Sequence, residues 1–363
     1  LDLHPLHKAI FSPPTPDAWD VAFLSSDWFA QAHAEGTVAD LSPWLAANPP
    51  AGYPDGWTRS LLDLHNFDGF VLGLPYHDGP ECLIYRTDLF ADPTNQARFA
   101  EQHGRPLALP RTWEEFHQVA RFFQRPEEGL YGTVFAAYPD GHNTVYDFCL
   151  QLWTRGGELF DSNGAIQVNT PEAAAALSFY RNVLNDRGAV HPDCRDMDSV
   201  KSGLAFATGQ VAMMINWFGF AGMAETVDES TVKGKVDVAA IPSSPGASPV
   251  SLNAYWILCI NRQSRHQDVA YQFLRHCASP AMDKLLTLTG GIGCRKSTWE
   301  DPEVNAEIPF YHKMADLHEY ARALPRRRDW SEIAAEIDRL VLAVINTDEP
   351  IEKLLEEAQG RLG

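Results

Sequence analysis

The chain has 363 residues, of which 45% are hydrophobic and 21% charged, and it carries a formal net charge of −19 at pH 7. This length is too great for one simple core and favours about two domains of ordinary size. The acidic balance argues against nucleic acid and anionic membrane surfaces as partners, because both would be repelled over the whole surface. No apolar run approaches the roughly 20 residues that span a bilayer.

The cysteines are widely spaced and include no Cys-x-x-Cys pair, which disfavours zinc sites and thioredoxin-like redox sites. Bridges would need an oxidising compartment, and buried free thiols are the favoured state. We therefore expect neither a metal nor a cofactor. The first sixteen residues lack the pattern of a signal peptide, since Asp2 interrupts them and prolines crowd their end.

The first elements are predicted to be a strand and a helix. Residues 19–25 (WDVAFLS) read as a strand, and the polar segment 26–28 opens a helix that ends near Gly36. A glycine-punctuated apolar run then reaches the loop around Pro75, and residues 82–86 form the strand that returns from it.

Two capped helices follow in the middle of the chain. Thr112 with Glu115 forms a capping box, and one apolar face follows it, made of Phe116, Val119, Ala120 and Phe123. Thr170 caps a second helix with Pro171 at its first position, and the predicted buried stripe is Ala173, Leu177, Tyr180 and Leu184. Between them, residues 158–168 indicate a hairpin turning at an Asn-Gly pair.

Short apolar strands are predicted at residues 210–216, 236–242 and 255–260. Strands that alternate with helices of this length indicate an α/β architecture. The Pro- and Ser-rich segment 242–249 is the best candidate for a linker between domains.

Two more helices are predicted after the last of these strands. Ser264 and Gln267 open the first, which is expected to turn Val269, Phe273 and Cys277 inward. Asp329 and Glu332 cap the second, and its apolar stripe consists of Ile333, Ile337, Leu340, Val341 and Val344.

Several segments together resemble the bacterial extracellular solute-binding proteins of the sugar-type ABC transporters. Each motif alone is degenerate, but their order across nearly the whole chain is specific. The matching segments are DGFVLGLPYHDGPECLIYRTDLF (68–90), LPRTWEEF (109–116), LWTRGGELFD (152–161), FATGQVAMMINW (206–217), VAAIPSSPG (238–246), LNAYWILCI (252–260), GGIGCRKS (290–297) and LPRRRDWSEI (324–333).

The resemblance implies an α/β, two-lobed periplasmic-binding-protein fold of type II. Each lobe would be a mixed sheet flanked by helices, with a ligand cleft at the hinge. Lobe 1 would comprise residues 1–86 and 243–298, and lobe 2 residues 87–242 and 299–363. One departure is that members of the family begin with a further strand and helix, so an estimated ~40 to 50 residues look absent before residue 19.

The resemblance also implies ligand-binding residues in lobe 1. Ser26, Asp27 and Trp28 would lie at the rim after the first strand, where Asp27 is either a hydroxyl acceptor or the N-cap of the following helix. Tyr76, His77 and Asp78 occupy the loop after Pro75 and would line the cleft, although a plain surface position is the alternative for His77. Polar groups of this kind meet sugar hydroxyls, and aromatic rings cover the C–H faces.

Two aromatic residues are the candidates in the second lobe. Tyr146 lies where the family often places a cleft aromatic, but it also fits a core stripe with Leu150 and Trp153. Trp217 follows a predicted strand and would be a stacking platform. Because the Gly-Pro that usually precedes this ring is missing, the role could shift to Phe218 or Phe220.

The remaining candidates lie in the last third of the chain. Asn253 and Tyr255 stand where the family tends to have glycines, which suggests a small or differently shaped ligand. Arg295 would reach the cleft or form a hinge salt bridge. Trp330 would be a second stacking ring, beside three arginines that form a solvated turn or clamp an anionic group.

The resemblance implies a monomeric periplasmic, or lipid-anchored extracellular, protein. It would bind a sugar, polyol or sugar derivative and deliver it to the permease of an ABC importer. One alternative is a ligand-sensing protein that presents its closed form to a receptor. A less favoured one is an enzyme acting on glycosides through a carboxylate pair such as Asp27 and Asp78, since the common catalytic motifs are absent and we expect no catalysis.

Overall fold

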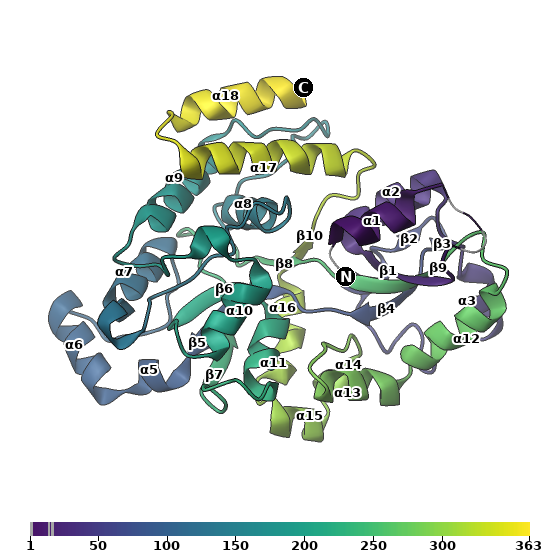
Figure 1. The fold of residues 1–363 in the computed structure, drawn as a ribbon, viewed down its shortest axis with the longest axis horizontal. Coiled ribbons are helices and arrows are strands. Elements are labelled where there is room, and N and C mark those ends of the chain that lie inside the picture. Colours follow the sequence, from purple (N-terminus) through teal and green to yellow (C-terminus); the bar gives the residue numbers. More distant parts are fainter. Residues whose placement is uncertain (1–2, 14, 16–17) are drawn as a thin grey trace. The chain divides into compact units, whose positions relative to one another are not determined.

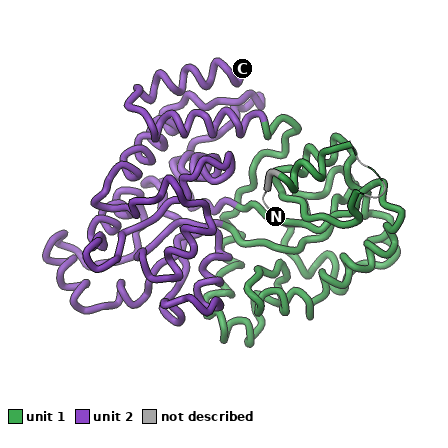
Figure 2. Tube along the Cα trace, viewed as in Figure 1, with its two compact units in different colours: residues 1–80, 253–331 green, residues 81–252, 332–363 purple. Residues whose placement is uncertain are grey.

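The computed structural model describes residues 3–13, 15 and 18–363. These residues form two compact units, shown in different colours in Figure 2. Unit 1 comprises residues 1–80 and 253–331, and unit 2 comprises residues 81–252 and 332–363. The chain therefore crosses from one unit to the other three times, after residues 80, 252 and 331.

Unit 1 is built on a three-stranded sheet whose central strand comes from the second part of the chain. Strand β9 (Trp256–Ile260) pairs antiparallel with β1 (Val21–Ser25) on one side and with β4 (Leu74–His77) on the other. Because β9 lies in the middle, the two segments of unit 1 fold into one core. The register places Val21 opposite Ile260 and Ser25 opposite Trp256.

Helices and short strands surround this sheet (Figure 1). The remaining elements of unit 1 are α1 (Leu3–Phe11), η1 (Ser26–Trp28), α2 (Phe29–Glu35), α3 (Ser42–Ala47), α4 (Arg59–Leu62), β2 (Asn66–Phe67), β3 (Phe70–Val71), α12 (Gln267–Cys277), α13 (Pro280–Leu288), α14 (Lys296–Trp299), α15 (Pro302–Glu307), η4 (Tyr311–Lys313), α16 (Met314–Glu319) and β10 (Ala321–Ala323). Strand β8 (Ser251–Asn253) contains the second crossing, and α17 (Trp330–Asn346) contains the third.

Unit 2 is also built on a three-stranded antiparallel sheet. Strand β5 (Glu81–Arg86) lies between β6 (Met213–Trp217) and β7 (Val236–Ala239). The register places Glu81, the first residue of the unit, directly opposite Trp217. The pairing therefore brings a carboxylate to the strand end that carries a predicted ligand-stacking ring.

The helices of unit 2 lie around its sheet, and α18 packs on α9 (Figure 1). They are α5 (Thr87–Ala91), α6 (Pro93–His103), α7 (Trp113–Phe123), η2 (Pro126–Glu128), α8 (Asn143–Trp153), α9 (Pro171–Asn185), η3 (Cys194–Asp196), α10 (Ser199–Ala207), α11 (Phe218–Thr226) and α18 (Ile351–Leu362). Among the described residues, no helix is both long and apolar enough to cross a bilayer.

The predicted helix caps of unit 2 are confirmed. The Thr112 hydroxyl accepts a hydrogen bond from the Glu115 amide at the start of α7, and the Thr170 hydroxyl does the same for Ala173 in α9. The four residues predicted for each apolar face are buried, as are the five predicted for α17. Each cap satisfies an amide that would otherwise lack a partner at a helix end.

The predicted inward face of α12 is wrong. Val269 is 71% exposed and Phe273 is 52% exposed, whereas Ala270, Tyr271 and Leu274 are buried. The segment carries apolar residues on two adjacent faces, so the helical period alone does not decide which face meets the sheet. The Tyr271 and Leu274 side chains join the core instead, and of the three residues predicted inward only the partly buried Cys277 packs against it.

The two units also divide the chain differently from the expected lobes. Residues 299–331 belong to unit 1, although they were assigned to lobe 2. The Trp299 indole N–H donates to the Gly293 carbonyl, and its ring stacks on His318. Lys284 reaches Asp301 across 2.9 Å. These contacts attach α14, α15 and α16 to the preceding part of unit 1.

All six cysteines are free thiols, and five of them are buried. Desolvation raises the pKa of the Cys259 thiol to about 12, so this group stays protonated at neutral pH. A buried, protonated thiol behaves as a small apolar side chain.

Candidate ligand-binding site

Three buried side-chain oxygens lie beside the first two crossings and lack a hydrogen-bond partner. They are Asp78 Oδ1, Glu81 Oε2 and Asn253 Oδ1. Their residues are 2%, 5% and 2% exposed, respectively. An unsatisfied buried polar group costs about 1–3 kcal/mol, so each oxygen is a candidate acceptor for a ligand hydroxyl.

In unit 1, Asp78 is held rigidly by one of its two carboxylate oxygens. His318 Nε2 lies 2.6 Å from Asp78 Oδ2, and His318 Nδ1 lies 3.3 Å from the Ser60 hydroxyl. The imidazole ring is stacked on Trp299, with ring centroids 4.9 Å apart. The second oxygen of Asp78 thus keeps a fixed position and remains available.

The two residues before Asp78 have different surroundings. The His77 ring accepts a hydrogen bond from the Ile292 amide through Nδ1, and desolvation lowers its pKa against the opposing effect of Asp78. The Tyr76 ring packs against the exposed Phe23 ring at 5.2 Å. Tyr76 and His77 are both half-buried. They stay candidates for ligand contact.

The polar turn after β1 is largely occupied by contacts within unit 1. The Asp27 carboxylate accepts a hydrogen bond from the Ser25 hydroxyl, and the Ser26 hydroxyl accepts one from the Tyr255 amide. Trp28 is buried and meets Trp256 edge-on at 5.9 Å. Trp28 therefore packs in the core of unit 1, and Ser26, Asp27 and Trp28 all remain predictions as ligand contacts.

Tyr255 and Arg295, which stay predictions as ligand contacts, are buried and make internal contacts. Tyr255 is fully buried, and its hydroxyl donates to the Leu61 carbonyl. The Arg295 guanidinium donates to the carbonyls of Ala51 and Ala278 and lies 4.2 Å from the centre of the Trp57 ring. Both side chains use their polar groups to hold loops of unit 1 together.

Trp330 and the arginines before it differ in their surroundings. Trp330 is buried at the start of α17 and stays a predicted stacking ring. Arg327 forms a bidentate pair with Asp329, and Arg326 donates to the carbonyls of Asp63 and Asn66. These two arginines therefore already have partners within unit 1.

In unit 2 the two predicted aromatic residues come together. The Tyr146 and Trp217 rings meet edge-to-face, 5.4 Å apart and at 85°. Tyr146 is buried and its hydroxyl lies 3.2 Å from His142 Nδ1, whereas Trp217 is partly exposed. Phe218 is fully buried, so among the ring positions considered at this strand end Trp217 is favoured over Phe218.

Glu81 was missed by the sequence analysis. Desolvation raises its pKa well above the usual range, and the nearby Asp147 carboxyl raises it further. Desolvation also raises the pKa of Asp147 to about 7, and the Tyr180 hydroxyl donates to this carboxyl across 2.5 Å. The sequence feature that could have indicated Glu81 is an acidic residue at the start of the apolar strand segment ECLIYR.

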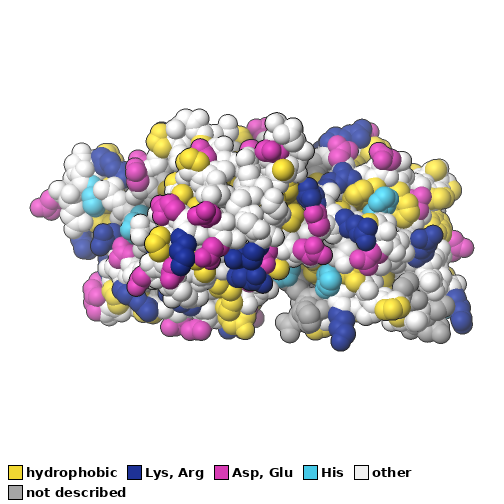
Figure 3. All heavy atoms as spheres, turned by 90° about the horizontal axis from the view of Figure 1, so that it is seen from above, with side chains coloured by type: hydrophobic (Ala, Val, Ile, Leu, Met, Phe, Trp, Pro, Cys, Tyr) yellow, Lys and Arg dark blue, Asp and Glu magenta, His cyan; other side chains and the backbone are white. Residues whose placement is uncertain are grey.

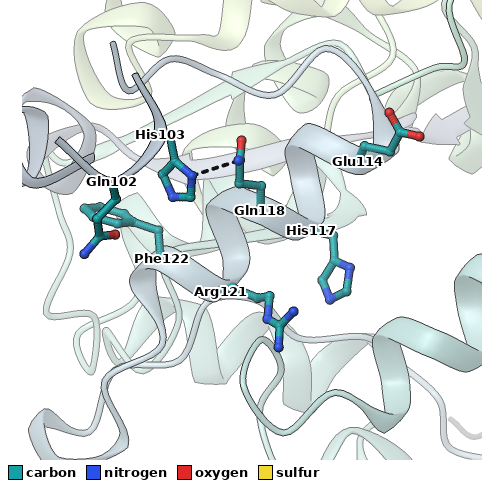
Figure 4. Close-up of a pocket in the computed structure, with 7 residues that line it drawn as sticks. All are labelled: Gln102, His103, Glu114, His117, Gln118, Arg121 and Phe122. Carbon is teal, nitrogen blue, oxygen red and sulfur yellow. Dashed lines mark hydrogen bonds between the residues drawn. The ribbon is translucent and has the colours of Figure 1, made fainter. Parts of the chain in front are cut away.

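A separate open pocket of about 540 Å³ lies on the surface of unit 2, over α6 and α7. Figure 4 shows the imidazole of His103 bonded to the Gln118 amide. Both His117 and Arg121 also contact the carboxylate of Asp186, at 2.7 Å and 3.2 Å. None of the predicted site residues lines this pocket, and these polar groups already have protein partners. The pocket is therefore a weaker candidate than the strand end at Trp217.

The acidic charge is dispersed on the face of the molecule drawn in Figure 3, where basic side chains lie among acidic ones. Within the described ranges, no group of three or more His, Cys, Asp or Glu side chains is arranged to hold a metal ion.

Two α/β units joined by three crossings, with polar and aromatic side chains near the crossing points, define a two-domain solute-binding class of protein. The chain belongs to the bacterial extracellular solute-binding proteins, because the model of that family matches residues 15–284. This family consists of binding proteins rather than enzymes.

Two curated relatives illustrate the relationship. A probable ABC transporter-binding protein of Deinococcus radiodurans is 25% identical over 79% of this chain and 66% of its own length. A mannitol-binding protein of Pseudomonas aeruginosa is 24% identical over 76% of this chain and 62% of its own length. The chain thus spans less than two thirds of the length of these curated relatives.

A solved structure confirms the fold. An ABC transporter solute-binding protein from Agrobacterium radiobacter, in complex with ribitol, superposes with a TM-score of 0.88 and 23% identity, covering 100% of this chain and 89% of that one. The architecture is that of the type II periplasmic-binding proteins, as predicted.

Proposed function

We propose that this protein binds a sugar or a sugar-derived polyol outside the cytoplasmic membrane and delivers it to the permease of an ABC importer. Family membership supports the carrier role. The ligand class is supported by the relative named a mannitol-binding protein and by the similar structure in complex with ribitol. The observation that carries the ligand class is the combination of a partly exposed Trp217 ring with buried, unpartnered acceptor oxygens.

This combination suits the two surfaces of a polyol. The C–H groups of the carbon chain can lie on the flat indole ring, and the hydroxyls can donate to fixed carboxyl or amide oxygens. Excluding water strengthens such hydrogen bonds, because the local dielectric constant falls. We propose Asp78 and Asn253 as the acceptor residues within unit 1, and Trp217 and Tyr146 as the aromatic residues within unit 2.

The test is a thermal-shift screen of the purified protein with D-mannitol, ribitol, D-glucitol, D-tagatose and maltose at ~1 mM. A ligand with a micromolar Kd stabilises the folded state by about 4 kcal/mol at this concentration, which raises the Tm by several degrees. NMR of the recovered ligand should show it unchanged. A cooperative melt that no sugar or polyol shifts, or turnover of a glycoside, would contradict the proposal.

A further inference from the structure

The carboxyl group of Glu81 lies beside the aromatic pair of unit 2. Glu81 and Trp217 are opposite each other in the antiparallel β5–β6 pairing, so their side chains emerge on the same face of the sheet. Directly opposed residues have Cβ atoms about 4.5–5.5 Å apart. Trp217 in turn meets Tyr146 edge-to-face. A carboxyl group and a partly exposed indole ring therefore share one end of the sheet.

Glu81 is fixed in place but incompletely satisfied. Its backbone carbonyl accepts a hydrogen bond from the Ser251 hydroxyl. Its strand, β5, is the central strand of the unit 2 sheet and pairs with β6 on one edge and β7 on the other. Its side chain is more than nine-tenths buried, and Oε2 has no hydrogen-bond partner. The protein thus holds a desolvated acceptor next to an aromatic surface, an arrangement that a donor group from a ligand would complete.

The charges around Glu81 discriminate between kinds of ligand. The charged group that acts on it is Asp147, another buried carboxyl, which raises the pKa of Glu81 beyond the effect of burial. Asp147 is bonded to the neutral Tyr180 hydroxyl. A carboxylate or phosphate on the ligand would face these acidic groups in a desolvated setting, whereas a hydroxyl would find an acceptor.

We infer that Glu81 is a specificity-determining residue that accepts a hydrogen bond from a ligand hydroxyl beside the Trp217 ring, and that the ligand is a neutral polyol or sugar. The site then selects against sugar acids and sugar phosphates. This inference rests on the proposed function. It adds that the ligand is uncharged and that Glu81 is the residue that selects for this property.

The experiment is isothermal titration calorimetry of the whole chain with D-mannitol and with D-gluconate, a sugar acid with the same number of carbon atoms. For the wild type we expect binding of D-mannitol and binding of D-gluconate at least about tenfold weaker. Glu81→Leu removes the acceptor and should weaken D-mannitol binding about tenfold or more. Glu81→Gln keeps an acceptor oxygen, and the raised pKa of Glu81 already favours its uncharged form, so this variant should keep both D-mannitol binding and the D-mannitol to D-gluconate ratio within about threefold of the wild type.

Glu225→Gln is the matched control. Glu225 is another buried acid of unit 2, but its carboxylate accepts a hydrogen bond from the Gly234 amide and lies on α11. This variant should keep the wild-type ratio of D-mannitol to D-gluconate affinity. Thermal melts without ligand check that every variant folds, and if Glu81→Leu does not fold, Glu81→Ala is measured in its place.

The outcomes separate the two proposals. If the wild type binds D-mannitol and the folded variant without the acceptor binds it equally tightly, the inference about Glu81 is overturned while the proposed function stands. Equal or tighter wild-type binding of D-gluconate would also overturn it. If the wild type binds none of the polyols or sugars in the thermal-shift screen, the proposed function fails, and the inference fails with it.

Discussion

The two units treat their aromatic and polar candidates differently. In unit 1, Trp28, Tyr255 and Arg295 are buried and have partners inside the unit. In unit 2, Trp217 is partly exposed, and the carboxyl opposite it has an unpartnered oxygen. Side chains of the same chemical types can thus be fully occupied within the fold or available to a ligand, and unit 1 also has available oxygens, on Asp78 and Asn253. The partners of a side chain, rather than its type, distinguish the two roles.

The largest effect that tests this comparison is on stability. Trp28→Ala should lower the free energy of unfolding by about 3–5 kcal/mol, because it removes a large buried side chain and leaves a cavity in the unit 1 core. Trp217→Ala should cost about 1 kcal/mol, since its ring is already partly exposed. Urea unfolding followed by circular dichroism measures both. Equal losses would remove the distinction between the two rings.

A second effect comes from the acidic interior of unit 2. The pKa of Asp147 is about 7 in the folded protein, well above its value of about 4 in an unfolded chain. The folded state therefore holds the proton more tightly. The stabilisation from this group is fully present below pH ~4 and is lost as the pH rises through about 7, with an upper bound of about 4 kcal/mol.

Asp147→Asn tests this pH dependence. The amide oxygen can still accept the hydrogen bond from Tyr180, but the side chain no longer titrates. Urea unfolding of both proteins at pH 4.5 and pH 7.5 isolates the contribution of this residue from that of other groups. We expect the wild type to lose more stability than the variant between these values. Identical losses would show that Asp147 has an ordinary pKa in the folded protein.

The effect on binding should be smaller in free energy but specific to unit 2. Trp217→Ala should weaken D-mannitol binding about tenfold, because the C–H groups of the ligand lose their aromatic surface. Trp217→Phe is the conservative control and should retain most of the affinity. Calorimetry measures each Kd. Unchanged affinity in Trp217→Ala would exclude this strand end as the ligand contact of unit 2.

The fold was largely predictable from the sequence, whereas the site was only partly so. Helix caps and apolar stripes are local patterns, and the segment order across the chain carried the family resemblance, so α7, α9, α17 and the two-unit architecture were anticipated. The burial of Tyr255 and Arg295 depends on partners far away in the sequence, such as Leu61 and Ala51. No local pattern reveals such partners.

Glu81 is the converse case, a candidate site residue that local sequence patterns did not reveal. As a residue type, it looks like an ordinary acid at the start of a strand. Its interest arises from the register with Trp217 and from the proximity of Asp147, which are both tertiary facts. Sequence order therefore indicated which loops to examine, but pairing and burial decided which side chains in them are available.

The smallest expected effect concerns the helix whose inward face was mispredicted. Val269→Ser on α12 should change the free energy of unfolding by less than about 0.5 kcal/mol, because the side chain is 71% exposed. Leu274→Ala on the same helix should cost about 2–5 kcal/mol, since Leu274 is fully buried in the unit 1 core. Urea unfolding of the two variants settles the orientation of α12. A loss above about 2 kcal/mol for Val269→Ser with little change for Leu274→Ala would reverse it, and Val269 would then take the place of Leu274 in the core.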